Sequence, residues 1–204
     1  MTYLRHFIFC IATVLNFAII QPVLSSSVSA VKSSIVHNEK QGLLKDLLNR
    51  APLYKKGGVP QATVGIIPYR FKNGITEVFL GQEKDLTWSD FGGKYEIADT
   101  NILSALQREF SEETGGSFVS KESADRPSSI LLYINKPDER EVFYLFVQFD
   151  DIGFKENDEK KQARWFDLMT LNTQTAFPLR KFFKSDLIES EHFKSIQDLL
   201  NAQK

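Results

Sequence analysis

Residues 92–116 read GGKYEIADTNILSALQREFSEETGG, and most of their charge lies in the second half. Four charged side chains fall within six residues there: Arg108, Glu109, Glu112 and Glu113. Polar residues at 99–101 and a glycine at 115 are typical of helix ends, so we predict a helix over residues 101–114. One arginine does not neutralise three nearby carboxylates, so the cluster needs a further partner.

The spacing of the three glutamates places them on one face of the predicted helix, because positions three and four apart are neighbours. Leu103, Leu106 and Phe110 form an adjoining apolar face that can anchor the helix on a sheet. Two carboxylates about 4 Å apart repel by ~4 kcal/mol at an effective dielectric of about 20. In a cleft, such a face requires a cation, and oxygen-only ligands favour Mg²⁺ or Mn²⁺ over zinc. The alternative is a solvated helix surface.

Strand-like and helical segments surround this helix. Residues 62–71 and 75–84 flank Lys72-Asn73-Gly74, and an Asn-Gly pair between β-rich runs predicts a hairpin. Further strands are predicted at 128–135, 139–150 and 163–168, a long polar loop at 150–162, and helices at 38–50 and 185–202. Hairpins without regular βαβ units predict an α/β protein in which helices cover a mixed sheet.

The charged run also resembles a known motif. Gly93, Asp99 and Arg108–Gly115 resemble the Nudix box, whose pattern is Gly, five residues, Glu, seven residues, then Arg-Glu-apolar-x-Glu-Glu-x-Gly-apolar. The resemblance covers roughly residues 62–200. Asp99 stands where the pattern has its first Glu, eight residues separate it from Arg108, and Gly116 replaces the last apolar residue. Either Asp99 or Glu96 can take the place of the first acid.

The resemblance implies a Nudix-type α/β/α sandwich around a mixed β-sheet. It implies a Mg²⁺- or Mn²⁺-dependent pyrophosphohydrolase that cleaves a nucleoside diphosphate linked to another moiety, or a related diphosphate. Glu112 and Glu113 then correspond to metal ligands, and Glu109 to a metal ligand or catalytic base. Arg108 corresponds to the residue that positions these acids, and Gly93 offers a backbone carbonyl to the metal.

The substrate is weakly marked. Tyr133 follows the box at a distance where some diadenosine-polyphosphate and diphosphoinositol-type members carry a tyrosine, although a strand tyrosine is more often buried. Some members draw a further acid from a later loop, and the candidates here are Glu156, Asp158 and Glu159. The resemblance implies a small nucleotide or diphosphate as the partner. The formal net charge of −1 gives no indication of nucleic-acid binding.

Two other functions stay open at this point. A Nudix-fold module can bind a nucleotide as a sensor without cutting it, and the altered first half of the box keeps that alternative. A general phosphomonoesterase would need a separate nucleophile signature, which the sequence lacks.

The N-terminus reads as a secretory signal peptide, residues 1–30. An uncharged, mostly apolar run of 14 residues follows MTYLRH, and Val28-Ser29-Ala30 fits a cleavage site. The run is too short for a stable membrane span, so we predict a secreted or cell-envelope protein, or one delivered to another cell. An uncleaved anchor is the alternative. The only cysteine, Cys10, lies in this segment, so the mature chain would have none. We therefore divide the chain into a signal peptide, an N-terminal helix and linker at 31–60, and a hydrolase domain at 61–204.

Overall fold

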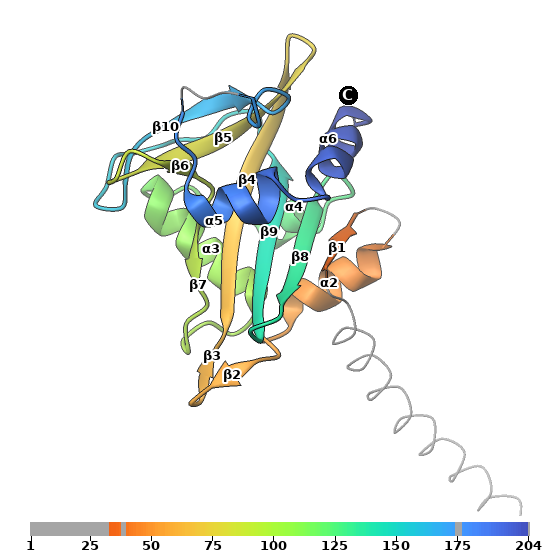
Figure 1. Ribbon diagram of the computed structural model, residues 1–204, viewed down its shortest axis with the longest axis vertical. Helices are drawn as coiled ribbons and strands as arrows, with labels where there is room; N and C mark the ends of the chain where they lie inside the picture. The colour runs from red at the N-terminus through yellow and green to blue at the C-terminus, as the bar shows by residue number, and fades with distance from the viewer. Residues whose placement is uncertain (1–32, 38–39, 174–176, 204) are drawn as a thin grey trace, which may run out of the picture. The chain divides into compact units, whose positions relative to one another are not determined.

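The computed structural model describes residues 33–37, 40–173 and 177–203, which belong to one folded unit (Figure 1). The predicted signal peptide and its cleavage site lie outside the described residues. Within the described ranges, no helix has the length and the hydropathy needed to cross a membrane.

A mixed sheet forms the centre of the unit. Its main path runs in the order β1 (Ser33–Val36), β8 (Ile130–Lys136), β9 (Arg140–Gln148), β4 (Ala62–Lys72), β5 (Ile75–Glu83) and β10 (Lys160–Asp167). Two short strands, β6 (Trp88–Ser89) and β7 (Phe91–Lys94), pair with β5 and β4 respectively. β4 and β9 pair in parallel and the other strand pairs of this sheet are antiparallel. A separate hairpin, β2 (Lys55–Lys56) and β3 (Val59–Pro60), lies within the predicted linker.

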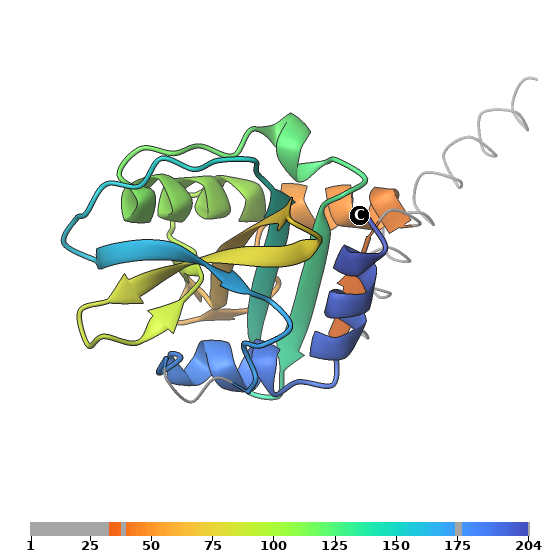
Figure 2. The ribbon, with the colours of Figure 1, turned by 90° about the horizontal axis from the view of Figure 1, so that it is seen from above.

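Helices cover both faces of the sheet. On one side lie α2 (Gln41–Asn49), α3 (Ile102–Thr114) and α4 (Lys121–Ala124). On the other side lie α5 (Lys181–Phe183), the π-helical turn η2 (Lys184–Ile188) and α6 (Phe193–Asn201), as Figure 2 shows. The prediction of a mixed sheet between layers of helices is therefore confirmed.

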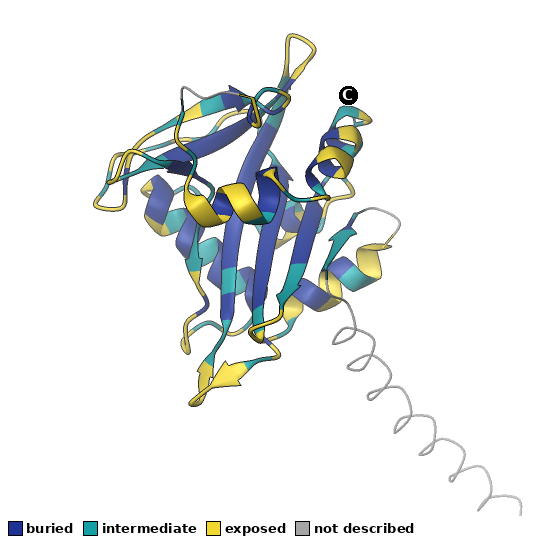
Figure 3. Cartoon of the chain, in the orientation of Figure 1, coloured by how far each residue is buried: buried dark blue, intermediate teal, exposed yellow. Residues whose placement is uncertain are grey.

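The core fills the space between these layers, and Figure 3 shows the central strands buried over most of their length. The predicted apolar face of α3 is confirmed, since Leu103, Leu106 and Phe110 are buried. On the opposite side, Phe193, Ile196 and Leu200 of α6 join the main apolar cluster. Burial of each such side chain contributes about 1.5–3 kcal/mol, so both helix layers are held to the sheet.

The hairpin of β4 and β5 shapes the region where the site lies. Asn73 and Gly74 both have positive φ, 51° and 75°, as the Asn-Gly turn predicts. The two strands pair only near this turn, from Tyr69↔Val78 to Lys72↔Ile75. Beyond it β4 pairs with β7, while β5 pairs with β6 and β10. Because β4 and β5 separate beyond the turn, β7 pairs with β4 and packs against α3.

Three segments differ from their predictions. The C-terminal helix predicted at 185–202 is interrupted after η2, where the Ser190 hydroxyl donates a hydrogen bond to the Leu187 carbonyl (2.6 Å) and competes with the helical pattern. β10 begins at Lys160, inside the predicted loop, because Lys160 pairs with Glu83. The segment predicted as helix and linker supplies α2 and also β1, whose Ser33 pairs with Ile134.

Candidate active site

Helix α3 carries the charged run, and both of its ends are capped. The Asn101 side chain accepts a hydrogen bond from the Ser104 backbone (2.8 Å), and the Ser104 hydroxyl oxygen accepts one from the Asn101 backbone (3.0 Å). Gly115 ends the helix in the left-handed region at φ 73°, which glycine adopts without strain. The helix predicted at 101–114 is therefore confirmed to within one residue.

A cavity of about 620 Å³ lies beside α3 and β7. Seven carboxylates line it: Glu83, Asp85, Glu96, Glu109, Glu112, Glu113 and Glu159. Only four basic side chains line it: Lys84, Lys94, Arg108 and Arg180. The cavity therefore has an excess of acid groups, and the alternative of a fully solvated helix face does not describe it.

Arg108 connects the two halves of the box. Its Nε and Nη2 donate to the two carboxylate oxygens of Asp99 at 3.1 and 3.0 Å. Glu96 is mostly exposed and its carboxylate lies 3.9 Å from Arg108 Nη1. The hydrogen bonds to Asp99 raise the pKa of Arg108 above its ordinary value. The sequence left Asp99 and Glu96 open as the first acid of the box. Of the two, it is Asp99 whose two carboxylate oxygens both accept hydrogen bonds from Arg108.

The loop before α3 absorbs the extra residue of the box. Asp99 accepts a hydrogen bond from the Glu96 backbone N–H (2.8 Å), and the Tyr95 hydroxyl donates to the Asp99 carbonyl (2.5 Å). These contacts close a tight loop, so the insertion leaves the position of Asp99 beside Arg108 intact.

Arg108 also bridges two of the helix glutamates. Its Nη1 donates to Glu109 at 2.9 Å and to Glu112 at 3.2 Å, and its Nη2 donates to the Lys94 carbonyl at 2.9 Å. Glu112 is exposed, whereas Glu109 is buried. Burial raises the pKa of Glu109, although Arg108 opposes that shift.

Gly93 of β7 makes room for Glu109. A Cβ atom at this position would lie 2.6 Å from both carboxylate oxygens of Glu109. Only glycine therefore lets the buried carboxylate lie against the strand, and the backbone of Gly93 faces the same cavity.

Glu113 lies deeper than its two neighbours on the helix. Its Oε2 accepts a hydrogen bond from the Gly92 backbone N–H at 2.6 Å, and its Oε1 lies 3.3 Å from Lys160 Nζ. Burial raises the pKa of Glu113 to about 8, and Lys160 only partly offsets this effect. The three glutamates thus share a helix face but differ widely in exposure, which spacing alone did not predict.

Comparison with known families identifies this arrangement. The NUDIX domain matches residues 59–185. The chain belongs to the Nudix family. The predicted family is thereby confirmed, and the prediction of a hydrolase that acts on phosphoanhydride bonds agrees with it.

Three proteins are similar to this Nudix chain over different shares of its length. The uncharacterized protein L534 of Acanthamoeba polyphaga mimivirus is 46% identical over 59 residues, which is 26% of this chain and 19% of that protein. A MutT/nudix family protein from Enterococcus faecalis has 22% identity and a TM-score of 0.44, covering 57% of this chain and 46% of that one. An Ap4A hydrolase from C. elegans has 17% identity and a TM-score of 0.44 over 70% of this chain and 96% of that one. The chain thus spans less than half the length of the first two.

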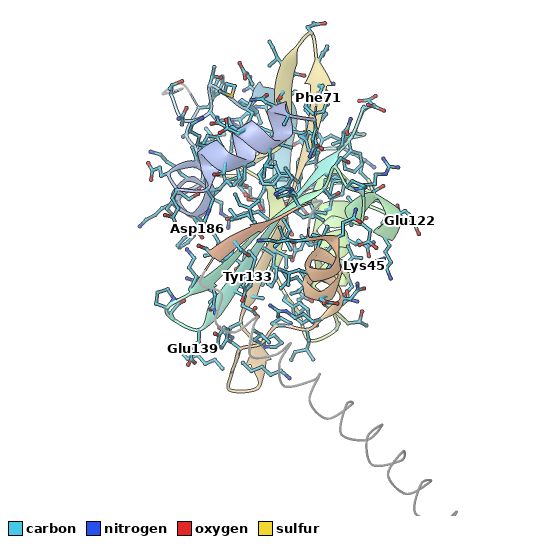
Figure 4. The ribbon with its side chains drawn as sticks, turned by 90° about the vertical axis from the view of Figure 1, so that its right-hand side faces the viewer. Lys45, Phe71, Glu122, Tyr133, Glu139 and Asp186 are labelled. Atoms are coloured by element: carbon cyan, nitrogen blue, oxygen red, sulfur yellow. The ribbon has the colours of Figure 1, made fainter. Side chains whose placement is uncertain are left out.

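The remaining predicted site residues divide into two groups. Glu159 lines the cavity of the Nudix site and is exposed. Glu156 lies outside its lining and is 3.7 Å from Lys161, and Asp158 is not among the lining residues either. Tyr133 is buried on β8 (Figure 4), where its hydroxyl donates to Glu141 (3.0 Å). It is not among the residues that line the cavity.

The residues of the Nudix site fit a divalent cation by their chemistry, although several of them already contact other protein groups. Among the described residues, no group of three or more His, Cys, Asp and Glu side chains is arranged to hold a metal ion as it stands. The reason is visible in the contacts: Arg108 spans Glu109 and Glu112, while Gly92 and Lys160 engage Glu113. The donors are nevertheless oxygens only and the cavity has excess carboxylate, so their chemistry fits a hard ion such as Mg²⁺.

Proposed function

We propose that this Nudix protein is a Mg²⁺- or Mn²⁺-dependent pyrophosphohydrolase that cleaves a nucleoside diphosphate linked to another moiety, or a related diphosphate. The observation that carries the proposal is the acid-rich cavity of about 620 Å³ beside the Nudix helix. Glu109, Glu112 and Glu113 would hold the cation there. A bound divalent ion would polarise the phosphoryl group and offset charge on the leaving oxygen.

The protein's own residues have separate tasks in this reaction. Arg108 orients Glu109 and Glu112 through its hydrogen bonds to both. Glu109 is a suitable proton acceptor for the attacking water, because a carboxylate of raised pKa is a stronger base. Lys94 and Arg180 are exposed, line the cavity and can pair with phosphate oxygens.

A second pocket supports a substrate of two parts. It has a volume of about 190 Å³ and shares Gly92, Gly93, Lys94 and Arg180 with the acid-rich cavity. Its other lining residues include four apolar or aromatic side chains: Val142, Tyr144, Phe182 and Phe183. A diphosphate in the first cavity would therefore lie next to a site for an apolar or aromatic group.

A substrate panel tests the proposal. The protein should release nucleoside monophosphate or phosphate from at least one nucleoside diphosphate derivative with Mg²⁺ or Mn²⁺, and EDTA should abolish this release. Full activity in EDTA would contradict the metal requirement. Ligand binding without turnover across a broad panel would instead favour a nucleotide sensor. The sensor is the second candidate function, because Arg108, Gly92 and Lys160 already contact the three glutamates that would hold the cation.

We also propose that the protein is exported, on the basis of the N-terminal sequence alone. Cleavage after Ala30 would leave every described residue in the mature chain. Mass spectrometry of secreted protein should then find a chain that begins at Val31. A protein that keeps Met1 and stays in a membrane fraction would contradict cleavage.

A further inference from the structure

Lys160 is completely buried behind the acid-rich cavity. Its ammonium group donates hydrogen bonds to Glu83 Oε1 (2.7 Å), the Ser89 hydroxyl (2.9 Å) and the Asp90 carbonyl (2.9 Å). These bonds use all three ammonium hydrogens, and Glu113 Oε1 lies 3.3 Å away as a fourth neighbour. A lysine is almost never fully buried unless it is paired, so this contact set is a built feature of the fold.

The strands around Lys160 leave a path for its side chain. Gly81 of β5 lies beside the aliphatic stem, where a Cβ atom would be 2.8 Å from Lys160 Cδ. The Phe91 ring also lies close to Gly81, and its centroid is 5.8 Å from Lys160 Nζ. A larger residue at position 81 would displace the stem, so the sheet itself directs the ammonium group toward the acids.

The backbone of Lys160 is tied to the end of the Nudix helix. The Asn157 side-chain oxygen accepts a hydrogen bond from the Lys160 N–H (2.9 Å), and its amide donates to the Glu113 carbonyl (2.9 Å). Asn157 thus connects the start of β10 to the last turn of α3. Two independent contacts therefore set the distance between Lys160 and Glu113. One is the direct approach of their side chains, and the other is the pair of hydrogen bonds by which Asn157 joins their backbones.

Lys160 acts on the cavity from inside the protein. Glu83 and Glu113 both line the cavity, whereas Lys160 is not among its lining residues. Its charge therefore offsets part of the carboxylate excess without occupying the space that a substrate or cation would use. A positive charge fixed there also repels any cation that approaches the same two carboxylates.

We propose that Lys160 is a positioning residue of this site, which holds Glu83 and Glu113 from the interior and limits the number and affinity of divalent cations that the cavity binds. Its effect on hydrolysis rests on the proposed function. Its effect on cation binding does not, because binding can be measured without turnover.

The test is a Mn²⁺ titration of the metal-free full-length protein, in which electron paramagnetic resonance measures free Mn²⁺. Lys160→Met removes the charge at similar length and should bind at least one further Mn²⁺ per chain, or bind Mn²⁺ about tenfold more tightly, than the wild type. Lys161→Met is the matched control, since Lys161 is the exposed neighbour, and should bind as the wild type does.

Unpaired carboxylates could unfold Lys160→Met, so a second variant keeps the test decisive. Lys160→Met with Glu83→Gln removes both charges of the closest pair and leaves Glu113 without its neighbouring cation. Circular dichroism should show that this double variant folds, and it too should bind Mn²⁺ more tightly than the wild type. A folded variant of either kind with the Mn²⁺ number and affinity of the wild type would overturn the proposal. A wild type without turnover would instead count against the proposed function.

Discussion

Asp99 and Glu96 compete for one role in the sequence, but only Asp99 is nearly buried against Arg108. Asp99→Asn should lower the free energy of unfolding by about 1–3 kcal/mol, because it weakens a two-point hydrogen bond to a charged group. Glu96→Gln should change it by less than about 0.5 kcal/mol, as expected for an exposed side chain. Urea unfolding of both variants checks this assignment, and equal losses would contradict it.

Removing the charge of the exposed Glu112 or of the buried Glu109 should lower turnover to a similar extent. Glu112→Gln and Glu109→Gln each remove one charge from the proposed cation site, so turnover should fall by about 100-fold or more. Glu109→Gln should not destabilise the fold, since burial already disfavours the ionised form of that side chain. Glu122→Gln is the control, because Glu122 lies on α4 at the periphery (Figure 4). Unchanged turnover in both helix variants would contradict the assignment.

Asp90 gives the fold a pH dependence. A Cβ atom at Gly65 would lie 1.7 Å from its carboxylate, and burial raises the pKa of Asp90 to about 6. Between about pH 4 and pH 6 the unfolded chain ionises this group while the folded chain keeps its proton, so stability falls as the pH rises. The free energy of unfolding, measured in urea without metal, should therefore decline over this range relative to Asp90→Asn. Parallel curves for the two proteins would refute this expectation.

At this scale the sequence predicted the acids and the arginine of the Nudix box. It could not predict that Lys160 is buried while Lys161 is exposed, because two adjacent lysines in a charged loop carry no pattern that separates them. It also could not exclude Tyr133 from the cavity, since the hydrogen-bond partner of its hydroxyl is Glu141, a residue of the neighbouring strand.

At the scale of elements, alanine substitutions at two neighbouring glycines of strand β7 should affect stability and turnover differently. A Cβ at Gly92 would lie 2.1 Å from the Val64 carbonyl, so Gly92→Ala should destabilise the protein by about 1–3 kcal/mol or more. At Gly93 the Cβ would meet only the end of the Glu109 side chain, so Gly93→Ala should reduce turnover with a smaller loss of stability. Thermal melts and turnover, measured together, check both variants.

Gly42 of α2 is the matched control for these substitutions. It has nothing within 4 Å of a built Cβ, so Gly42→Ala should stabilise the protein by about 0.5–1 kcal/mol. Equal effects of all three alanines would show that close approach at β7 does not matter.

Elements with a strong local signal were predicted well. The Asn-Gly turn between β4 and β5 and the caps of α3 are examples. The short strands β1, β2, β3, β6 and β7 were missed, because two to four residues are too few to show a periodicity. Of these, β1 and β7 pair with strands that are distant in the sequence. The interruption after η2 was missed because Ser190 lies within a run of otherwise helical spacing.

At the scale of the whole molecule, the family match at residues 59–185 is smaller than the folded unit. A chain truncated to that range would lose buried side chains on both sides of the sheet: Leu44, Leu47, Leu48, Phe193, Ile196 and Leu200. At about 1.5–3 kcal/mol each, the loss is comparable to the 5–15 kcal/mol that stabilises a typical domain. Circular dichroism should show no cooperative melt for the truncated chain, in contrast to the full chain; equal melts would contradict this.

The order of strands in the sheet also has a kinetic consequence. β1 pairs with β8, β4 with β9 and β5 with β10, and in each pair the second strand lies far along the chain from the first. Loops of roughly 80 to 100 residues must close before these ladders form, and pairing of such high contact order is slow. A growing chain would therefore expose unpaired strand edges until residues 130–167 had been synthesised. Folding of the sheet therefore cannot finish until the last third of the chain has been synthesised. A chaperone that shields strand edges would act before synthesis reaches that part of the chain.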